Sequence, residues 1–516
     1  MKVLVKDIKV PVTIRDQLSY IKKRLTEILD GAKINDFEIR RKAIDARNKD
    51  RMVYFVYQVA VDVSGNIRFS DRIIPIEYYT LPAIKVKERI VPVIVGSGPC
   101  GLFSALLFTY YGVSGTIVER GCRIDERVKK VEILWQQGIM DEECNCQFGE
   151  GGAGTFSDGK LTTRVKEDLI GFVLREFLRF GAPEDILIDA KPHVGTEYVR
   201  KVVKNIRNFL VDNGWNFLFN TKVIDITTKG KKIDSIITNN GTVSGTHYIF
   251  AIGNSSRDTF RMLINRGVAI VPKAFAVGFR IENPQEVIDK NQYGRFHKYL
   301  PPATYNLSHH FKDINRGVYS FCMCPGGYVI LASSSSGEIV TNGMSYFKRD
   351  SGYANSAIVV TVDERDFGES PLSGVEFQEM IEKSAFSITN SYRAPIQRAI
   401  DFVKSRTTKG DIKTTFRPSV VPYDLEKLYP KHLVDVLKRG LIEFDKRIKG
   451  FLATGVLIAP ETRTSSPVRI LRETAKLNST SYENLYPAGE GSGYAGGIMS
   501  SIIDGLKVVF SILNRE

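Results

Sequence analysis

Three glycines at G-x-G-x-x-G spacing are the residues of this sequence whose chemistry is most directly implied by their type and spacing. Gly96, Gly98 and Gly101 follow an apolar run, Ile90–Val95, that suits a buried strand. In such a turn the glycines allow the tight bend, leave room for a pyrophosphate and let a helix pack on the strand. Glu119, which ends a second predicted strand, is placed to accept hydrogen bonds from a ribose. We predict a dinucleotide site; the alternative is a glycine turn that binds nothing.

A second glycine-rich segment, Gln147–Arg164, contains five glycines in the sixteen residues from Gly149. So much glycine carries a large backbone entropy cost, which close approach to a planar or phosphate-bearing ligand explains. Lys160 and Arg164 add positive charge to the same segment. We predict a loop that lies against the cofactor; the alternative is a flexible surface loop.

A third glycine-rich element lies near the C-terminus. The predicted strand Leu485–Ala488 leads to Gly489 and Glu490, and a predicted helix begins near Gly497. A carboxylate after a strand can hold ribityl hydroxyls, and a helix N-terminus offers N–H groups and positive dipole to an anionic flavin edge. Two nucleotide-contacting elements at opposite ends of the chain favour FAD over NAD, because the longer cofactor needs both.

The six cysteines include two C-x-C pairs, Cys144 with Cys146 and Cys322 with Cys324. Six cysteines in 516 residues do not make a disulfide framework, so reduced and partly buried thiols are expected. Two alternatives remain open. Cys322 and Cys324, on one side of a predicted strand, favour a redox pair, since a C-x-C disulfide is a strained ring with oxidising character. The two pairs together would suit a metal or iron–sulfur site only if the fold joins them.

The elements that position these residues predict an α/β fold built from separated segments. Residues 1–88 show a β-α-β-β order typical of a small α/β-plait (ferredoxin-like) module. Strands and helices then alternate through a first FAD-binding part, and a substrate-covering α+β region with a predicted helix at Ala394–Ser405 follows. The predicted domains are 1–88 (plait module), 89–256 (FAD-binding, first part), 257–450 (substrate-covering) and 451–516 (FAD-binding, C-terminal part).

Composition narrows the class of protein. No window reaches the roughly 18 unbroken apolar residues of a membrane span, and no signal sequence is recognisable at the N-terminus, so a cytoplasmic protein is expected. The net charge of +14 is spread along the chain without an arginine-rich arm. An RNA-associated flavoprotein with a basic first module is therefore kept as an alternative, although nucleic acid is not the expected partner.

The motifs together resemble a family of largely uncharacterised bacterial FAD-dependent dehydrogenases with a glutathione-reductase-like FAD fold. The resemblance covers nearly the whole chain and implies FAD binding and oxidoreductase activity, with the substrate unassigned. It rests on GSGPCG, QFGEGGAGTFSDGKLTTR, KPHVGT, FAVGFRIENPQEVID, FCMCPGG, NGMSYFKRDS, ETRTSSPVRILRE and GEGSGYAGG. The cofactor contacts that it and the spacing imply are Gly96, Gly98, Pro99, Gly101, Glu119, Arg120, Gly151, Gly152, Val223, Gly253, Gly489, Glu490, Gly496, Gly497 and Ile498.

The expected activity is hydride transfer between bound flavin and a small substrate, whose anionic character the nearby cationic side chains favour. No second G-x-G-x-x-G with its own acid is present, so the electron donor is expected to be a transiently docked NAD(P)H or another protein. No metal is expected. The candidates for catalysis or substrate binding are Cys322, Cys324, Lys160, Arg164 and Arg469.

Overall fold

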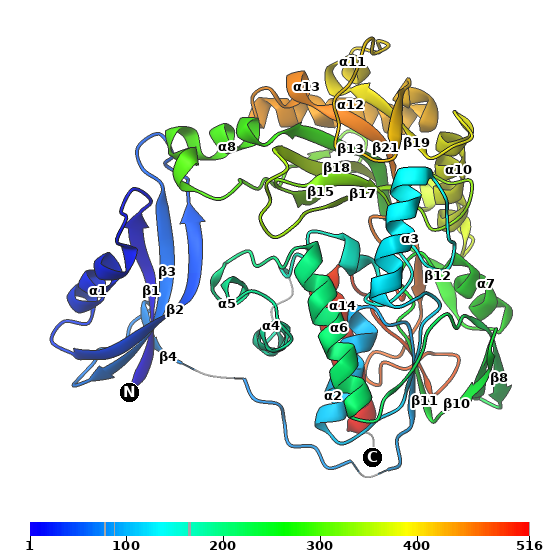
Figure 1. Cartoon of the computed structure of the whole chain (residues 1–516), viewed down its shortest axis with the longest axis horizontal. Coiled ribbons are helices and arrows are strands. Elements are labelled where there is room, and N and C mark those ends of the chain that lie inside the picture. Colours follow the sequence, from blue (N-terminus) through cyan, green and yellow to red (C-terminus); the bar gives the residue numbers. More distant parts are fainter. Residues whose placement is uncertain (77–78, 87, 164–166, 515–516) are drawn as a thin grey trace.

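A parallel sheet lies at the centre of the part of this mixed α/β protein that contains the first glycine motif (Figure 1). The computed structural model describes residues 1–76, 79–86, 88–163 and 167–514. The strand order is β23-β11-β5-β6-β7, so the C-terminal strand β23 pairs beside strands from the first half of the chain. These strands are β5 (Pro92–Val95), β6 (Thr116–Val118), β7 (Asn216–Leu218), β11 (His247–Phe250) and β23 (Leu485–Pro487).

The first helix after the glycine turn is buried on all sides. Helix α2 (Pro99–Tyr110) begins with proline at its first position, where the missing N–H is not needed, and every residue from Cys100 to Phe108 is buried. The C-terminal helix α14 (Ile498–Leu513) packs against α2. A Cβ on Gly505 would lie 2.6 Å from the Ser104 hydroxyl, so glycine is what permits this close approach.

Smaller elements surround the parallel sheet. A β-hairpin turn at Lys229–Lys232 joins β8 to β9 in a three-stranded antiparallel sheet. The elements in this part are α3 (Ile124–Gln137), η1 (Ala153–Phe156), α4 (Leu169–Arg179), α5 (Asp185–Ile188), α6 (Thr196–Asp212), β8 (Val223–Lys229), β9 (Lys232–Thr238), β10 (Gly241–Ser244), α7 (Arg257–Asn265), β12 (Ile270–Pro272) and β22 (Val468–Ile470).

A seven-stranded mixed sheet of order β14-β15-β18-β13-β21-β19-β20 forms the second large layer. Its strands are β13 (Phe275–Pro284), β14 (Ser308–Phe311), β15 (Arg316–Cys324), β18 (Tyr353–Val362), β19 (Arg393–Arg398), β20 (Ser419–Pro422) and β21 (Val456–Glu461). Helices cover it (Figure 1), and the remaining elements of this part are α8 (Gln285–Tyr293), η2 (Gly294–Tyr299), β16 (Tyr328–Leu331), β17 (Thr341–Met344), α9 (Glu364–Phe367), α10 (Ser373–Ser387), α11 (Ala399–Val403), η3 (Leu425–Leu428), α12 (Lys431–Arg447) and α13 (Phe451–Thr454).

Two features of this sheet differ from the expectations. Residues 456–461, which the sequence groups with the C-terminal FAD-binding part, form β21 between β13 and β19, so the chain returns to the parallel sheet only at β23. The helix predicted at Ala394–Ser405 is wrong in its first half, because β19 pairs with β21 and β20 there. Tertiary strand pairing outweighs the local helix pattern at this place.

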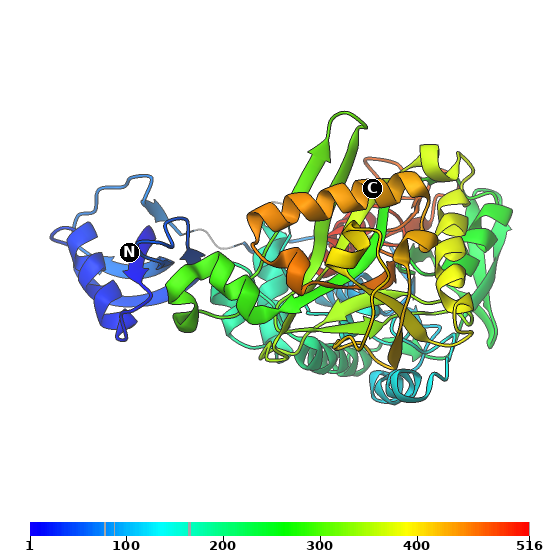
Figure 2. The same cartoon turned by 90° about the horizontal axis from the view of Figure 1, so that it is seen from above.

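The N-terminal module, residues 1–76, is an antiparallel sheet of order β2-β3-β1-β4 with one helix. None of residues 65–72, between β3 and β4, is helical, so the second helix of a complete plait is missing from this described segment. The module lies at one end of the molecule beside α8 (Figure 2). Its elements are β1 (Lys2–Pro11), α1 (Gln17–Ile28), β2 (Lys33–Asp45), β3 (Tyr54–Ser64) and β4 (Ile73–Pro75).

The apolar core of the N-terminal module includes a side chain from outside it. Phe296, on η2, is buried among the module's own apolar residues, and Leu300 packs against the same cluster. Backbone contacts reinforce the junction, since the Ala190 N–H donates to the Lys42 carbonyl at 2.9 Å. The module is thus anchored to the body by shared core as well as by covalent connection.

Among the described residues, no helix is both long and apolar enough to cross a membrane.

Candidate functional site

A cavity opens where the carboxyl ends of β5, β11 and β23 meet the glycine-rich segments. Ligands of open α/β sheets bind in this place, outside the carboxyl ends of the strands. Gly101, Gly151 and Gly496 do not line the cavity, although the sequence predicts them as cofactor contacts. The predicted contacts that do line it are Gly96, Gly98, Pro99, Glu119, Arg120, Gly152, Val223, Gly253, Gly489, Glu490, Gly497 and Ile498.

The first glycine turn has the backbone geometry that the motif implies. Gly96 has φ of +104°, and a Cβ there would lie 2.4 Å from the Ala251 carbonyl oxygen. A Cβ on Gly101 would lie 2.0 Å from the Gly96 carbonyl oxygen, so Gly101 serves helix packing and not the cavity surface. Gly98 is the N-cap of α2, and the free N–H groups of that helix end offer an anion site.

Glu119 ties the glycine turn to the glycine-rich loop. One carboxylate oxygen accepts from the Ser97 N–H and hydroxyl, both at 2.8 Å, and the other accepts from the Gly121 and Gly149 N–H groups at 2.9 and 3.0 Å. A carboxylate has about four lone-pair sites, and all are filled. The predicted ribose contact therefore requires a ribose hydroxyl to replace one donor, and the rotatable Ser97 hydroxyl is the donor that moves without the backbone.

Arg120 belongs to a four-residue ionic network at the rim of the cavity. Its guanidinium binds Asp258 through two hydrogen bonds of 2.9 Å and Glu143 at 2.7 Å, and it stacks 3.9 Å from the centre of the Phe148 ring. Lys222 contacts the same two carboxylates at 2.7 and 2.9 Å. Burial alone would raise the pKa of Asp258, but Arg120 and Lys222 outweigh it and hold that pKa well below its usual range. Arg120 therefore holds the segments at the rim of the cavity together, and its charge is paired with those of Asp258 and Glu143.

The glycine-rich loop is held in place by Arg127, a residue that the sequence analysis does not single out. The guanidinium is fully buried in α3 and donates to the carbonyls of Asn145, Cys146, Glu150 and Gly152 at 2.8–2.9 Å, and to the Thr155 hydroxyl at 2.7 Å. Burial lowers the pKa of Arg127 to about 10. The loop is thus an internally bonded wall of the cavity and not a flexible surface segment.

A sequence signal for Arg127 does exist. The buried residues of α3 are Ile124, Arg127, Val131 and Leu134, so the arginine stands at an apolar position of an amphipathic helix. An arginine on that face needs buried acceptors, and the carbonyls of a glycine-rich loop supply them.

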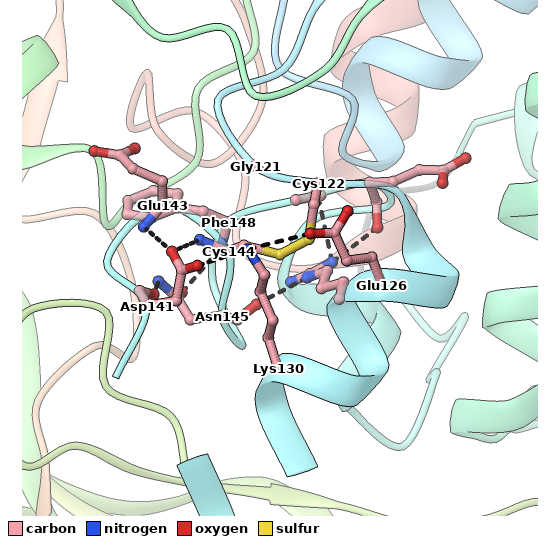
Figure 3. Close-up of a disulfide and its surroundings, with 12 residues drawn as sticks. Gly121, Cys122, Glu126, Lys130, Asp141, Glu143, Cys144, Asn145 and Phe148 are labelled. Atoms are coloured by element: carbon pink, nitrogen blue, oxygen red, sulfur yellow. Dashed lines mark hydrogen bonds and ion pairs between the residues drawn. A yellow bond between two sulfur atoms is a disulfide. The ribbon is translucent and has the colours of Figure 1, made fainter. Parts of the chain in front are cut away.

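A disulfide joins Cys122 to Cys144, so the expectation of free thiols is wrong for these two residues. It links the segment after β6 to the start of the glycine-rich region (Figure 3). Asp141 supports the same turn by accepting from the Glu143 and Cys144 N–H groups at 3.0 and 2.9 Å. With Cys144 in a disulfide, an iron–sulfur site made of both C-x-C pairs is excluded.

Cys322 and Cys324 lie outside the surface of the cavity and beside two cations. The Lys160 ammonium is 3.8 Å from the Cys324 sulfur and donates to the Met323 carbonyl, while the Arg280 guanidinium donates to the Cys322 carbonyl at 2.8 Å. Arg280 is fully buried and binds Glu461 through two hydrogen bonds of 2.7 Å. The fold therefore brings together two sequence candidates, the cysteine pair and Lys160.

Of the two other cationic candidates, one is placed by the structure. Arg469, on β22, is exposed and lies 5.1 Å from the centre of the Tyr494 ring; Arg164 lies outside the described residues. Lys273 follows β12, the partner strand of β22, and was not predicted. Burial first, and then the Arg469 charge, lowers the pKa of Lys273, while Glu490 opposes that shift.

Glu490 is the carboxylate that the C-terminal glycine-rich element contributes to the cavity. It is half-buried and accepts a hydrogen bond from the Asn254 amide at 2.9 Å. Burial raises its pKa to about 7, and neither Lys273 nor Asn254 reverses the shift. A carboxyl poised near neutrality beside a ligand cavity is suited to exchange a proton.

Replacing Glu490 by glutamine is expected to change the pH dependence of stability. The folded state holds this proton more tightly than the unfolded state, so the wild-type contribution is lost as pH rises from about 4.5 to about 7. The stability of Glu490→Gln relative to the wild type should therefore increase by about 2 kcal/mol between pH 5 and pH 8. Urea unfolding of the apoprotein at both pH values measures this, and a constant difference would contradict the assignment.

The comparisons with known proteins come from sequence and from structure. Residues 274–464 match the family described as "FAD-dependent protein, C-terminal domain-like". A Clostridium beijerinckii protein, described as an "Uncharacterized protein", is 43% identical over 518 residues, which cover 97% of each chain. Glycine oxidase from Bacillus cereus aligns over 83% of this chain and 96% of its own at 11% identity and a TM-score of 0.33. L-Amino acid deaminase from Proteus myxofaciens aligns over 85% and 94% at 11% identity and a TM-score of 0.33.

Proposed function

This chain belongs to the family of FAD-dependent proteins and is an oxidoreductase with FAD as its cofactor, and we propose from that premise that it transfers a hydride between flavin and a small anionic substrate. The observation that carries the proposal is that three separated glycine-rich segments line one and the same cavity. We further propose that the FAD-binding part is of the glutathione-reductase type, with the seven-stranded sheet as its substrate-covering part.

The residues of the cavity fit FAD as an extended ligand. The turn at Gly96 and Gly98 with the N-terminus of α2 would hold the pyrophosphate, and the Val223 backbone would meet the adenine. The N-terminus of α14, at Gly497 and Ile498, would face the flavin, where its positive dipole favours negative charge. When bound, FAD supplies the hydride and electron chemistry. The protein supplies orientation, charge and exclusion of water.

The positively charged side chains near Glu490 support the proposal that the substrate is a small anion. Arg469 on β22 pairs with Val271, two residues before Lys273, and the charges of Arg469 and Glu490 both act on the pKa of Lys273. Lys160 donates to the Met323 carbonyl, lies 3.7 Å from Asp158 and does not line the cavity. We therefore assign substrate anion binding to Lys273 and Arg469, and proton exchange to Glu490.

An absorbance spectrum of the purified protein tests the cofactor site, and an anaerobic titration tests the reaction. The paired near-ultraviolet and blue bands of oxidised flavin are expected, either as purified or after addition of FAD. Bleaching by NADH or NADPH would identify a nicotinamide as the donor; bands that resist both would assign the donor role to another protein or to the substrate. A protein that stays colourless and takes up no FAD would contradict the proposed function.

A further inference from the structure

Cys322 occupies an unusual backbone position within strand β15. Phe321 pairs with Ala357 and Cys324 pairs with Asn355, so the pairing of β15 with β18 contains a bulge at Cys322 and Met323. Cys322 has φ of +45°, in the left-handed region that residues other than glycine rarely adopt. Bulges re-aim side chains, and backbone held in such a region is common at functional sites. Nothing in strand pairing alone requires a cysteine at this place.

The surroundings of the pair favour a thiolate on one sulfur. Cys322 is partly exposed and Cys324 is fully buried. A hydrogen bond from Cys324, together with the Lys160 and Arg280 charges, holds the pKa of Cys322 well below its usual range although burial opposes it. The same hydrogen bond, with burial, holds the pKa of Cys324 well above its usual range. An accessible thiolate beside a buried thiol is the arrangement of a nucleophile and its resolving partner.

The pair lies next to the cofactor cavity. Lys160, which contacts Cys324, belongs to the glycine-rich segment Gln147–Arg164, whose residues Gly149 and Gly152 line that cavity. The charge of Cys322 also contributes to the raised pKa of Glu490, which lines the cavity. Lys160 thus connects the cysteine pair to a wall of the cavity.

We propose that Cys322 and Cys324 form a redox-active pair that passes electrons from the reduced cofactor to a small disulfide substrate. This inference rests on the proposed function and narrows it, because it names a disulfide as the class of substrate. Lys160, Arg280, Asp158, Glu461 and Glu490 are the charged groups that surround the pair.

The cycle balances as follows. In the oxidised pair, the Cys322–Cys324 S–S bond accepts two electrons and two protons from the reduced cofactor and becomes two thiols. The Cys322 thiolate attacks one sulfur of the substrate disulfide, whose S–S bond breaks and whose first half leaves as a thiol. Cys324 then loses its proton and attacks the Cys322 sulfur, which releases the second thiol and restores the protein disulfide. The substrate is reduced by two electrons and the cofactor is oxidised by two.

The nucleophile is tested by trapping, which needs no flavin. Cys324→Ser treated with glutathione disulfide is expected to retain one glutathionyl group per chain on Cys322, located by mass spectrometry of peptides. Cys322→Ser is expected to retain none. Cys146 is the internal control in Cys324→Ser, because it is a buried free cysteine that does not line the cavity. It should stay unmodified in that variant, and Cys146→Ser is the matched control variant. Equal labelling of Cys146 and Cys322, or none at Cys322, would overturn the proposal.

Electron transfer to the pair is tested in the FAD-loaded protein by anaerobic reductive titration. The wild type and Cys146→Ser are expected to consume four electrons per flavin, two for the flavin and two for the Cys322–Cys324 disulfide, while the buried Cys122–Cys144 disulfide stays oxidised. Cys322→Ser and Cys324→Ser should consume two. If the flavin-loaded wild type consumed only two electrons, the proposal of a redox-active cysteine pair would be overturned, and the proposed function would remain intact. A protein that binds no flavin would contradict the proposed function, while the trapping experiment would still decide the reactivity of Cys322.

Discussion

Gly98→Ala is expected to weaken FAD binding by at least about 100-fold while the apoprotein stays as stable as the wild type. Gly98 has φ of −71°, and a Cβ there would meet only the Gly152 Cα at 3.8 Å, so the fold accommodates alanine. The added methyl occupies the place where a pyrophosphate must approach the backbone at the start of α2. The expected loss corresponds to about 2.7 kcal/mol of binding free energy. Flavin fluorescence titration gives the affinity, and thermal unfolding gives the stability.

Gly101→Ala is the informative comparison, since it changes the same motif in a different way. Its Cβ would lie 2.0 Å from the Gly96 carbonyl oxygen, a backbone atom that cannot yield without opening the turn. This variant should lose stability as well as FAD. If Gly98→Ala bound FAD as tightly as the wild type, the cavity would not be the pyrophosphate site.

Arg127→Met is expected to lower the free energy of unfolding by about 3–5 kcal/mol, because it leaves the carbonyls that the guanidinium satisfies buried without donors. The side chain makes hydrogen bonds to Asn145, Cys146, Gly149, Glu150, Gly152 and Thr155. The loop that they form is one wall of the cavity, so FAD affinity should fall together with stability. Urea unfolding and limited proteolysis of the loop measure the two effects.

Lys129→Met is the matched control for Arg127→Met, because it removes a cation from an exposed position of the same helix. It is expected to leave stability within about 0.5 kcal/mol of the wild type. Similar losses in the two variants would mean that the charge of α3, and not the buried hydrogen bonds, supports the loop.

The sequence predicts the elements around the glycine motif well because the information there is local. Strand β6 (Thr116–Val118) ends one residue before Glu119, the residue that ends the second strand predicted from the sequence. The helix predicted at Ala394–Ser405 fails for the opposite reason, since strands distant in the sequence enclose β19. Pro395 within that segment is the local signal against a helix, because proline breaks helix interiors.

The residues of the candidate site fall into the same two groups, those determined by the local sequence and those determined by the fold. Residues that belong to short glycine motifs, such as Gly98 and Gly489, are predictable from the sequence alone, and they line the cavity. The residues that hold the motifs together were missed, because their partners are set by the fold. Arg127 donates to the carbonyl of Asn145, 18 residues later in the chain, and the pairing of β12 with β22 brings the charge of Arg469 near Lys273. The pairing of Cys122 with Cys144 likewise cannot be deduced from spacing.

The shared core at Phe296 has a consequence for how the chain is made. The strands of the N-terminal module leave the ribosome first, yet their apolar cluster is completed by a residue of η2 from the middle of the chain. At ordinary rates of synthesis the module waits on the order of tens of seconds for that residue. During that interval the apolar surface that Phe296 later covers is open to water and to other proteins. Nascent chains that stop before η2 therefore expose an apolar surface that chaperones can bind and through which chains can aggregate. The core of the module is complete only when η2 has been synthesised and has packed against it.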